Sequence, residues 1–176
     1  MLIGWLSMIV LERILKGIDF ICERVAKFAS FLVIFLILVV VYEVVSRYAF
    51  DAPTIWAFEI ARMLGGSLFV LGFAYVLIIK AHIRVDLLYK RLSPRGQAIL
   101  DVVFTLIMVF PLWIVAMPRM IEWTSQSWAI HEVSSDSAWR VPIYPFKTVA
   151  PVAISLLLLA LVATFIRDLR TIVRGK

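Results

Sequence analysis

Cysteine and histidine are scarce in this sequence, and each scarcity excludes a kind of site. The only cysteine, Cys22, rules out an internal disulfide and a cysteine-rich metal centre. Two histidines, His82 and His131, are too few for bis-histidine haem ligation inside membrane spans, which argues against a membrane anchor of a redox enzyme. Hydrolase, kinase, zinc and nucleotide motifs are lacking, so we expect no cofactor, no bound metal and no catalysis.

Charged residues are also few, at 17% of the 176 residues, whereas hydrophobic residues make up 63%. A soluble domain of this length does not need so many apolar side chains, so the composition predicts an integral membrane protein. The net charge of +6 is then explained by cationic loops at the membrane surface, and we expect no nucleic-acid partner.

Long apolar runs predict an all-α fold with four transmembrane helices. About 20 apolar residues cross the hydrocarbon core of a bilayer. A membrane domain is therefore expected over residues 28–166, followed by a basic tail at 167–176. The four predicted spans are residues 28–48, 55–79, 96–118 and 147–166.

Residues 1–27 precede the first span and are predicted to form an amphipathic helix. Apolar side chains recur there at helical spacing, and charged side chains occupy the other face. Two readings stay open: the helix lies in the membrane interface, or it is a solvated helix packed on a partner.

The distribution of Lys and Arg predicts the orientation. The segment before the first span carries four of these residues, the loop at 80–95 carries five and the tail carries four. The turn at 50–54 carries none, and the connection at 119–147 has three, balanced by three acids. The positive-inside rule therefore places both termini in the cytoplasm, and the turn and the 119–147 connection on the outer face.

Four charges lie in or beside the apolar runs: Glu43, Arg47, Glu59 and Arg62. A charge at the centre of a membrane helix costs about 2.5–3.5 kcal/mol, so such residues usually have partners. Because the turn between the two helices is short, we expect the arginines to pair with the glutamates in some combination. A structural clamp and a proton or ion relay are both possible roles, and the balance of two acids with two bases favours the clamp.

Small residues on the second span are predicted to form a helix-packing face, made by Ala61, Gly65 and Gly72. Small side chains let helix backbones approach closely in lipid. The face is expected to pack against another helix, in this chain or in a partner.

An ordered set of residues forms a pattern that runs through much of the chain: Arg47, Tyr48, Pro53, Trp56, Glu59, His82 and Asp86. It continues in the later run Glu132-Val133-Ser134 with Trp139, Pro142 and Pro145. This set resembles the DctQ-like small membrane subunit of tripartite ATP-independent periplasmic (TRAP) transporters, and the resemblance covers roughly residues 28–166.

The resemblance implies a bacterial inner-membrane subunit of a sodium-driven transporter for carboxylate or sulfonate organic acids. In such a transporter a large multispan subunit carries the substrate and sodium sites and moves as an elevator, and a periplasmic binding protein delivers the substrate. The small subunit is a non-catalytic scaffold, surrounded by membrane lipids, that is not expected to bind substrate. It is expected to help dock the binding protein, here through Glu122, Glu132, Asp136, Trp139 and Arg140.

A second hypothesis is a homodimeric, proton-coupled exporter of the small multidrug type. Such exporters use a membrane-embedded glutamate that exchanges protons with cargo, and Glu43 or Glu59 would be that residue. Against this, both glutamates have an arginine at helical neighbour spacing.

Overall fold

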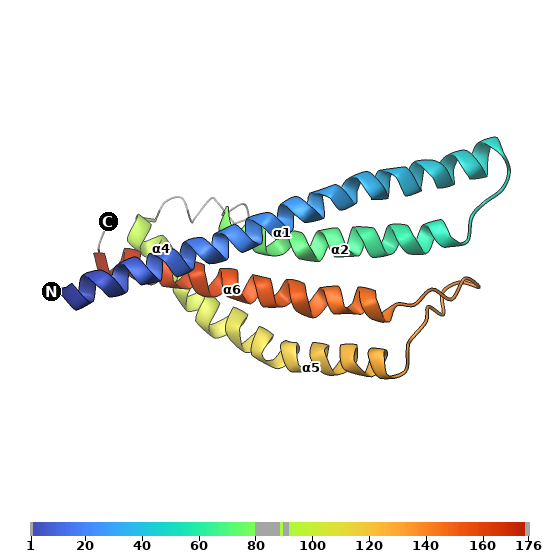
Figure 1. The fold of residues 1–176 in the computed structure, drawn as a ribbon. Coiled ribbons are helices and arrows are strands. Elements are labelled where there is room, and N and C mark those ends of the chain that lie inside the picture. Colours follow the sequence, from blue (N-terminus) through green and yellow to red (C-terminus); the bar gives the residue numbers. More distant parts are fainter. Residues whose placement is uncertain (1, 80–88, 90–91, 175–176) are drawn as a thin grey trace. The chain divides into compact units, whose positions relative to one another are not determined.

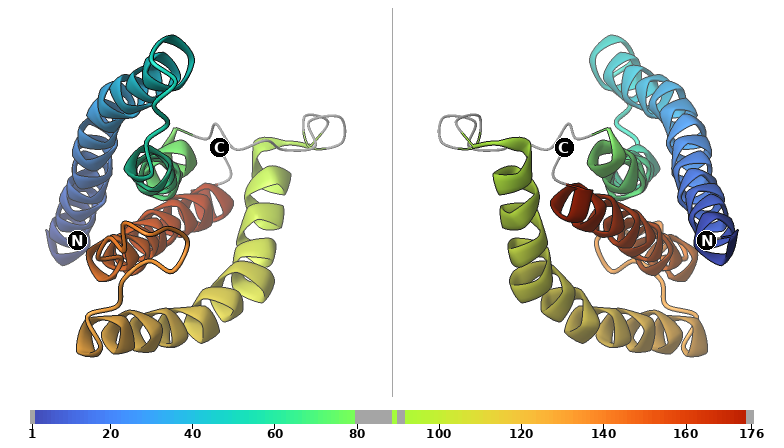
Figure 2. Two further views of the ribbon diagram at one scale, coloured as in Figure 1. Left: turned by 90° about the vertical axis from the view of Figure 1, so that its right-hand side faces the viewer. Right: turned by 90° about the vertical axis from the view of Figure 1, so that its left-hand side faces the viewer.

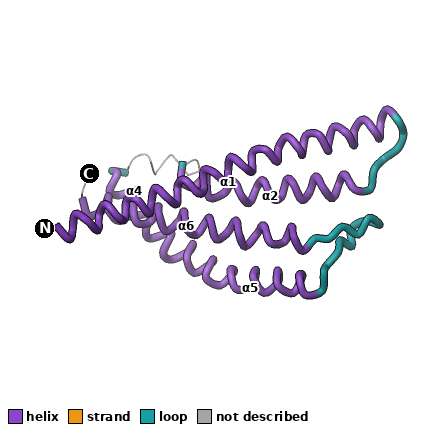
Figure 3. The backbone as a smooth tube through the Cα atoms, in the orientation of Figure 1, coloured by secondary structure: helices purple, strands orange, loops and turns teal. Residues whose placement is uncertain are grey.

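The computed structural model describes residues 2–79, 89 and 92–174, and this part of the chain is helical with connecting loops (Figures 1 and 3). The described residues contain no strand, only an isolated antiparallel bridge between Val133 and Pro142. The elements are α1 (Leu2–Ala49), α2 (Trp56–Ile78), α4 (Pro94–Phe104), the π-helix η1 (Thr105–Val109), α5 (Phe110–Ala129) and α6 (Tyr144–Arg174).

Among the described residues, four helical stretches are long and apolar enough to cross a membrane, in agreement with the predicted all-α fold with four transmembrane helices. They are Ile9–Ala49, Trp56–Ile78, Pro94–Ala129 and Tyr144–Val173. Three of them extend well beyond the predicted spans. The prediction counted only the apolar core of each span, whereas a helix continues through polar residues until a turn or an unfavourable residue ends it.

α1 is one continuous helix, so the structure does not separate the predicted N-terminal helix from the first span. No glycine or proline occurs between Gly17 and the end of α1, and the sequence therefore offers no local break. The location of residues 1–27 at the membrane surface stays a prediction, as does the cytoplasmic location of both termini.

The third span contains two prolines in its interior, Pro111 and Pro118, and remains helical throughout. Its start is capped as its sequence suggests: Ser93 Oγ accepts a hydrogen bond of 3.2 Å from the Gly96 amide, and Pro94 is the first helical residue. The π-helix η1 ends at Val109, two residues before Pro111, and the Phe110 amide donates to the Thr105 carbonyl. A proline ring clashes with the preceding helical turn, and a π turn at that point relieves the clash.

The chain divides into two compact units, whose segments can be followed by colour in Figure 2. The first unit comprises Met1–Glu23, Ala74–Ala116 and Ser155–Lys176. Its buried centre is formed by Cys22, Ala74 and Ala160, which are small enough to let three helices approach closely.

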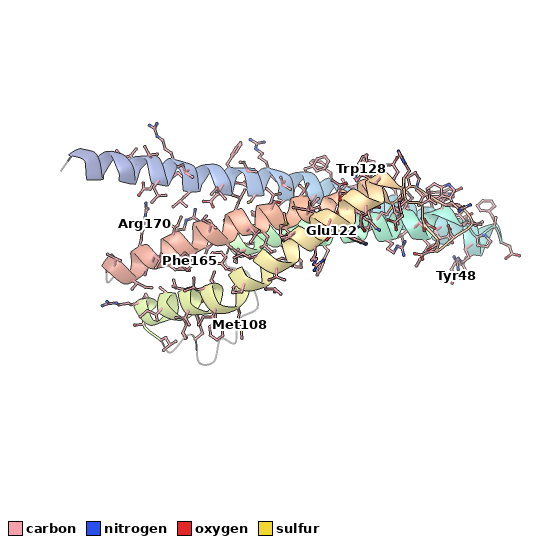
Figure 4. The ribbon with its side chains drawn as sticks, turned by 90° about the horizontal axis from the view of Figure 1, so that it is seen from below. Tyr48, Met108, Glu122, Trp128, Phe165 and Arg170 are labelled. Atoms are coloured by element: carbon pink, nitrogen blue, oxygen red, sulfur yellow. The ribbon has the colours of Figure 1, made fainter. Side chains whose placement is uncertain are left out.

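Ion pairs join α1 to α6 within the first unit. Arg167 Nη2 lies 2.6 Å from Asp19 Oδ2, and Arg170 Nη1 lies 3.8 Å from Glu12 Oε1. Figure 4 shows the labelled Arg170 on α6 extending toward α1. The charged face of the N-terminal part of α1 is therefore partly neutralised inside the chain.

The second unit comprises Arg24–Phe73 and Met117–Ile154. It contains the membrane charges, the α1–α2 turn at residues 50–55 and the loop at residues 130–143. We call these two connections together the turn-and-loop surface, and the candidate site lies there.

Candidate functional site

Glu43 organises the turn between α1 and α2. Its Oε1 accepts hydrogen bonds from Arg47, at 3.1 Å from Nε and 2.5 Å from Nη2. Its Oε2 accepts from the backbone amide of Thr54 at 3.1 Å and from the Thr54 hydroxyl. One carboxylate thus satisfies an arginine on its own helix and the residue that leads into the next helix.

The turn has a defined shape. Ser46 Oγ donates to the Ala52 carbonyl at 2.6 Å, and the Ala52 amide donates to the Ser46 carbonyl at 3.0 Å. Asp51 has a φ of 51°, a left-handed conformation that Asp tolerates better than most residues. These bonds hold Pro53 and the residues after it in a fixed position.

The structure corrects the predicted partner of Arg62. Its guanidinium pairs with Asp136 of the 130–143 loop, and not with Glu43 or Glu59. Glu43 and Arg47 pair at helical spacing, whereas the Arg62 partner lies 74 residues away in the sequence, in a loop that folds back on α2. The four membrane charges therefore do not form one closed network within the described residues.

Glu59 is fully buried, and neither oxygen of its carboxyl group has a hydrogen-bond partner among the described residues. Burying a polar group without such a partner costs about 1–3 kcal/mol by mutational measures. A buried group of this kind requires an explanation in a native structure.

The 130–143 loop is attached to both neighbouring helices by Glu132. Lys147 Nζ of α6 lies 2.5 Å from Glu132 Oε2, and Ser127 Oγ of α5 donates to the same oxygen at 2.6 Å. Hydrogen bonds from Lys147 and Ser127 hold the pKa of the Glu132 carboxyl below its usual value. Lys147 is buried, and its ammonium also lies 3.9 Å from the centre of the Trp123 ring.

Backbone hydrogen bonds close the loop on itself. The Ser134 amide donates to the Val141 carbonyl at 2.8 Å, and the Ile143 amide donates to the Glu132 carbonyl at 3.0 Å. At its base the labelled Trp128 (Figure 4) donates from Nε1 to Thr148 Oγ1 at 2.8 Å. The loop is thus an ordered surface between α5 and α6.

A groove of about 410 Å³ opens between the two parts of the turn-and-loop surface. Its walls are apolar and include two tryptophans, Trp56 and Trp139. Trp56 also packs on Tyr42, with ring centroids 5.4 Å apart, so that its position is fixed from α1. The complete lining is Pro53, Thr54, Ile55, Trp56, Ala138 and Trp139.

Close approach to α2 occurs at Gly66, which was not in the predicted packing face. A Cβ atom at Gly66 would lie 3.2 Å from Cζ of Phe146 on α6, whereas one at Gly65 or Gly72 would have no atom within 4 Å. Ala61 lines a second cavity, of about 170 Å³, between α1 and α2. Packing of Gly65 and Gly72 against a partner stays a prediction, since no described part of this chain covers them.

A metal site is not formed by the described residues: no three His, Cys, Asp or Glu side chains gather closely enough among residues 2–79, 89 and 92–174. The site consists of ion pairs, an ordered loop and an aromatic groove, which suit the binding of another protein.

A family model described as "Tripartite ATP-independent periplasmic transporters, DctQ component" matches residues 36–171. The chain belongs to this family. The match covers the second unit almost entirely and most of the helical chain. No curated protein matches the chain at the threshold used for a significant similarity.

Family membership makes the chain the small permease subunit of a TRAP transporter, a multi-pass protein of the inner membrane. TRAP small subunits work together with a large permease subunit and a substrate-binding protein, and their family is one of transporter components that are typically non-catalytic.

The structure also locates the residues of the family pattern. Arg47 pairs with Glu43, and Tyr48 is 82% exposed at the end of α1. Pro53 and Trp56 line the groove, and Glu59 is buried. The remaining two, His82 and Asp86, lie outside the described residues.

The residues predicted to dock the binding protein differ in how exposed their side chains are and in whether they are already paired. Trp139 and Arg140 are exposed, and Glu122 is exposed beside Arg119 at 3.5 Å. Asp136 is half-exposed in its pair with Arg62. Glu132 is turned inward and pairs with the buried Lys147. The position of Lys147 in the sequence, after Pro145, gave no signal of this contact.

Proposed function

We propose that this chain is the fixed scaffold of a sodium-driven TRAP transporter for organic acids that carry a carboxylate or sulfonate group. In this role it binds neither sodium nor substrate. It holds the large permease subunit in the membrane while the transport domain of that subunit moves, and it offers a docking surface to the periplasmic substrate-binding protein.

The observation that carries the scaffold role is how little of each helix is covered within the chain. Only 6% of the apolar windows in Ile9–Ala49, Trp56–Ile78 and Pro94–Ala129 is buried, against 33% in Tyr144–Val173. Helices that leave so much apolar surface uncovered have room for a second membrane protein and for lipids. The open faces at Gly65 and Gly72 suit close packing of a partner helix.

The docking role is supported by the turn-and-loop surface. Hot spots of protein interfaces are enriched in Trp and Arg. Here an exposed Trp139 and the neighbouring Arg140 lie on a loop that Glu132 and Lys147 hold in place. With both termini in the cytoplasm, as the basic residues predict, this surface faces the periplasm, where the binding protein is found.

Purification of the tagged chain from its native membrane in mild detergent tests the scaffold role. We expect a large multispan protein to be recovered in equal amount. Recovery of this chain alone, or only with copies of itself, would contradict the scaffold and favour the exporter hypothesis.

The exporter alternative now depends on Glu59 alone. Glu43 already accepts hydrogen bonds from Arg47 and Thr54 and is poorly suited to exchange protons with cargo. An exporter that uses Glu59 predicts transport by the isolated chain in liposomes and its loss in Glu59→Gln. The scaffold predicts no transport by either form.

A further inference from the structure

Glu59 is the one described glutamate whose two carboxyl oxygens are both buried and without a hydrogen-bond partner. The proposed scaffold role does not explain why this carboxyl group is buried. A buried carboxyl with no partner in one conformation is explained if a second conformation supplies the partner.

Contacts on either side of Glu59 place it beneath the 130–143 loop and the start of α6. One turn earlier in α2, Trp56 borders the groove with Trp139. One turn later, Arg62 pairs with Asp136, and one turn beyond that Gly66 approaches Phe146. Positions 59, 62 and 66 share one face of a helix, so the buried Glu59 carboxyl lies on the face of α2 that the loop and α6 approach.

The other charges on the surrounding elements are already engaged or turned outward. On α1, Arg47 is bound to Glu43, and on α6, Lys147 is bound to Glu132. Arg140, on the loop, is exposed. Arg62 is also engaged, but it lies three residues after Glu59, a spacing at which helical side chains meet.

The present pair of Arg62 is the least protected of those that anchor the loop. The side chains of Arg62 and Asp136 are 46% and 48% exposed, whereas Lys147 is 9% exposed in its pair with Glu132. Water and salt weaken exposed ion pairs far more than buried ones. Asp136 can also be hydrated without Arg62, because about half of its side chain is already exposed.

We propose that Arg62 is a two-position latch that exchanges Asp136 for Glu59. In the closed position, seen here, Arg62 holds the loop through Asp136 and Glu59 is buried alone. When the central part of the loop lifts from α2, Arg62 turns to Glu59, and water reaches both side chains. The new pair offsets the loss of the old one, so the loop has two discrete positions.

This latch gives the docking surface a way to respond to its partner. A protein that engages Asp136 or Trp139 removes the closed-state acceptor of Arg62 and favours the lifted loop. Only this use of the latch rests on the proposed function, because the exchange itself is a property of the chain alone.

Hydrogen exchange measured by mass spectrometry, on the full-length chain in lipid nanodiscs, tests the latch. The reporters are the segments that contain the Ser134 and Ile143 amides, whose hydrogen bonds close the loop. Glu59→Gln removes the open-state partner, so exchange should slow by roughly two- to tenfold, the lower part of the range expected for residues of one network. In an Arg62→Gln background the same substitution should slow exchange much less.

Either of two results would overturn the latch: Glu59→Gln has the same effect in both backgrounds, or it accelerates exchange. If the Glu59 variants do not fold, Asp136→Asn gives a second test, because it alters an exposed loop residue. It should accelerate exchange by roughly two- to tenfold, and unchanged exchange would also overturn the proposal.

Glu122→Gln is the matched control, since Glu122 is in an exposed ion pair with Arg119 three residues away, on α5. Loop exchange should be unchanged in this variant. Because no other protein is present, failure of the latch would leave the scaffold untouched, and failure to recover the large subunit would leave the latch untouched.

Discussion

Lys147, in the first turn of α6, donates a 2.5 Å hydrogen bond to Glu132, which lies 15 residues earlier in the chain. The ammonium is nearly excluded from solvent, and the ring of Trp123 covers one side of it. This ion pair connects the ordered loop to the membrane helix.

Replacement of Lys147 by Met should loosen the loop and lower the thermal unfolding midpoint of the purified chain. The apolar stem is kept, but the inward-turned Glu132 loses its charged partner. Fluorescence-detected unfolding in detergent measures the change. Arg119→Met, in an exposed pair with Glu122, is the control and should leave the midpoint almost unchanged. Equal midpoints for the two variants would show that the Lys147 pair does not stabilise the chain.

Acid should weaken the same attachment. The pKa of Glu132 is lower in the folded chain than its usual value, so its ionised form stabilises the fold at every pH above the ordinary range of Glu, about 4.3. That contribution disappears as the pH falls through the lowered pKa. The unfolding midpoint should therefore decline with acidification, and Glu132→Gln should flatten this part of the curve. An unchanged slope in Glu132→Gln would assign the decline to another group.

Replacement of Gly66 and of Gly72 in α2 by leucine should have different effects on the stability of the chain. Gly66→Leu places atoms where Phe146 already lies, so it should destabilise the chain by about 1–3 kcal/mol, as overpacking does. A Cβ atom at Gly72 meets no described atom within 4 Å, so Gly72→Leu should leave the stability of the isolated chain intact. If this face packs on the large subunit, however, Gly72→Leu should reduce the recovery of that subunit in co-purification. Normal recovery would remove Gly72 from the subunit interface.

Trp139→Ala should weaken docking of the substrate-binding protein by roughly tenfold, since an exposed Trp beside a groove is typical of an interface hot spot. Uptake measured against the concentration of binding protein gives the change. Val115→Ala is a control on an exposed apolar side chain of α5 and should leave this dependence unaltered. Docking that is equally strong in the Trp139 variant would exclude the groove as a contact.

The sequence was sufficient to predict the helices, because apolar runs indicated four spans. The four-residue spacing of Glu43 and Arg47 is compatible with the ion pair that the structure shows, but the sequence left open which arginine pairs with which glutamate. The continuity of α1 was missed because a change from charged to apolar residues suggested a boundary, although no residue there breaks a helix.

Contacts through the 130–143 loop were not predictable. Arg62 meets Asp136 and Lys147 meets Glu132 only because this loop folds back between α2 and α6. The spacing of these residues in the sequence does not predict the course of the loop. The close approach at Gly66 was not predicted for a related reason, while packing of Gly65 and Gly72 on a partner stays a prediction. Gly65 and Gly66 are adjacent in the sequence, and only the rotation of α2 against Phe146 decides which of them is covered.

The central claim is that the chain is a required but non-transporting scaffold, and reconstituted uptake tests it most directly. Proteoliposomes would contain the large subunit with or without this chain, and the binding protein, labelled organic acid and a sodium gradient would be supplied. We expect uptake only when all three proteins are present, and none from this chain alone. Full uptake without this chain, or transport by this chain alone, would contradict the scaffold role.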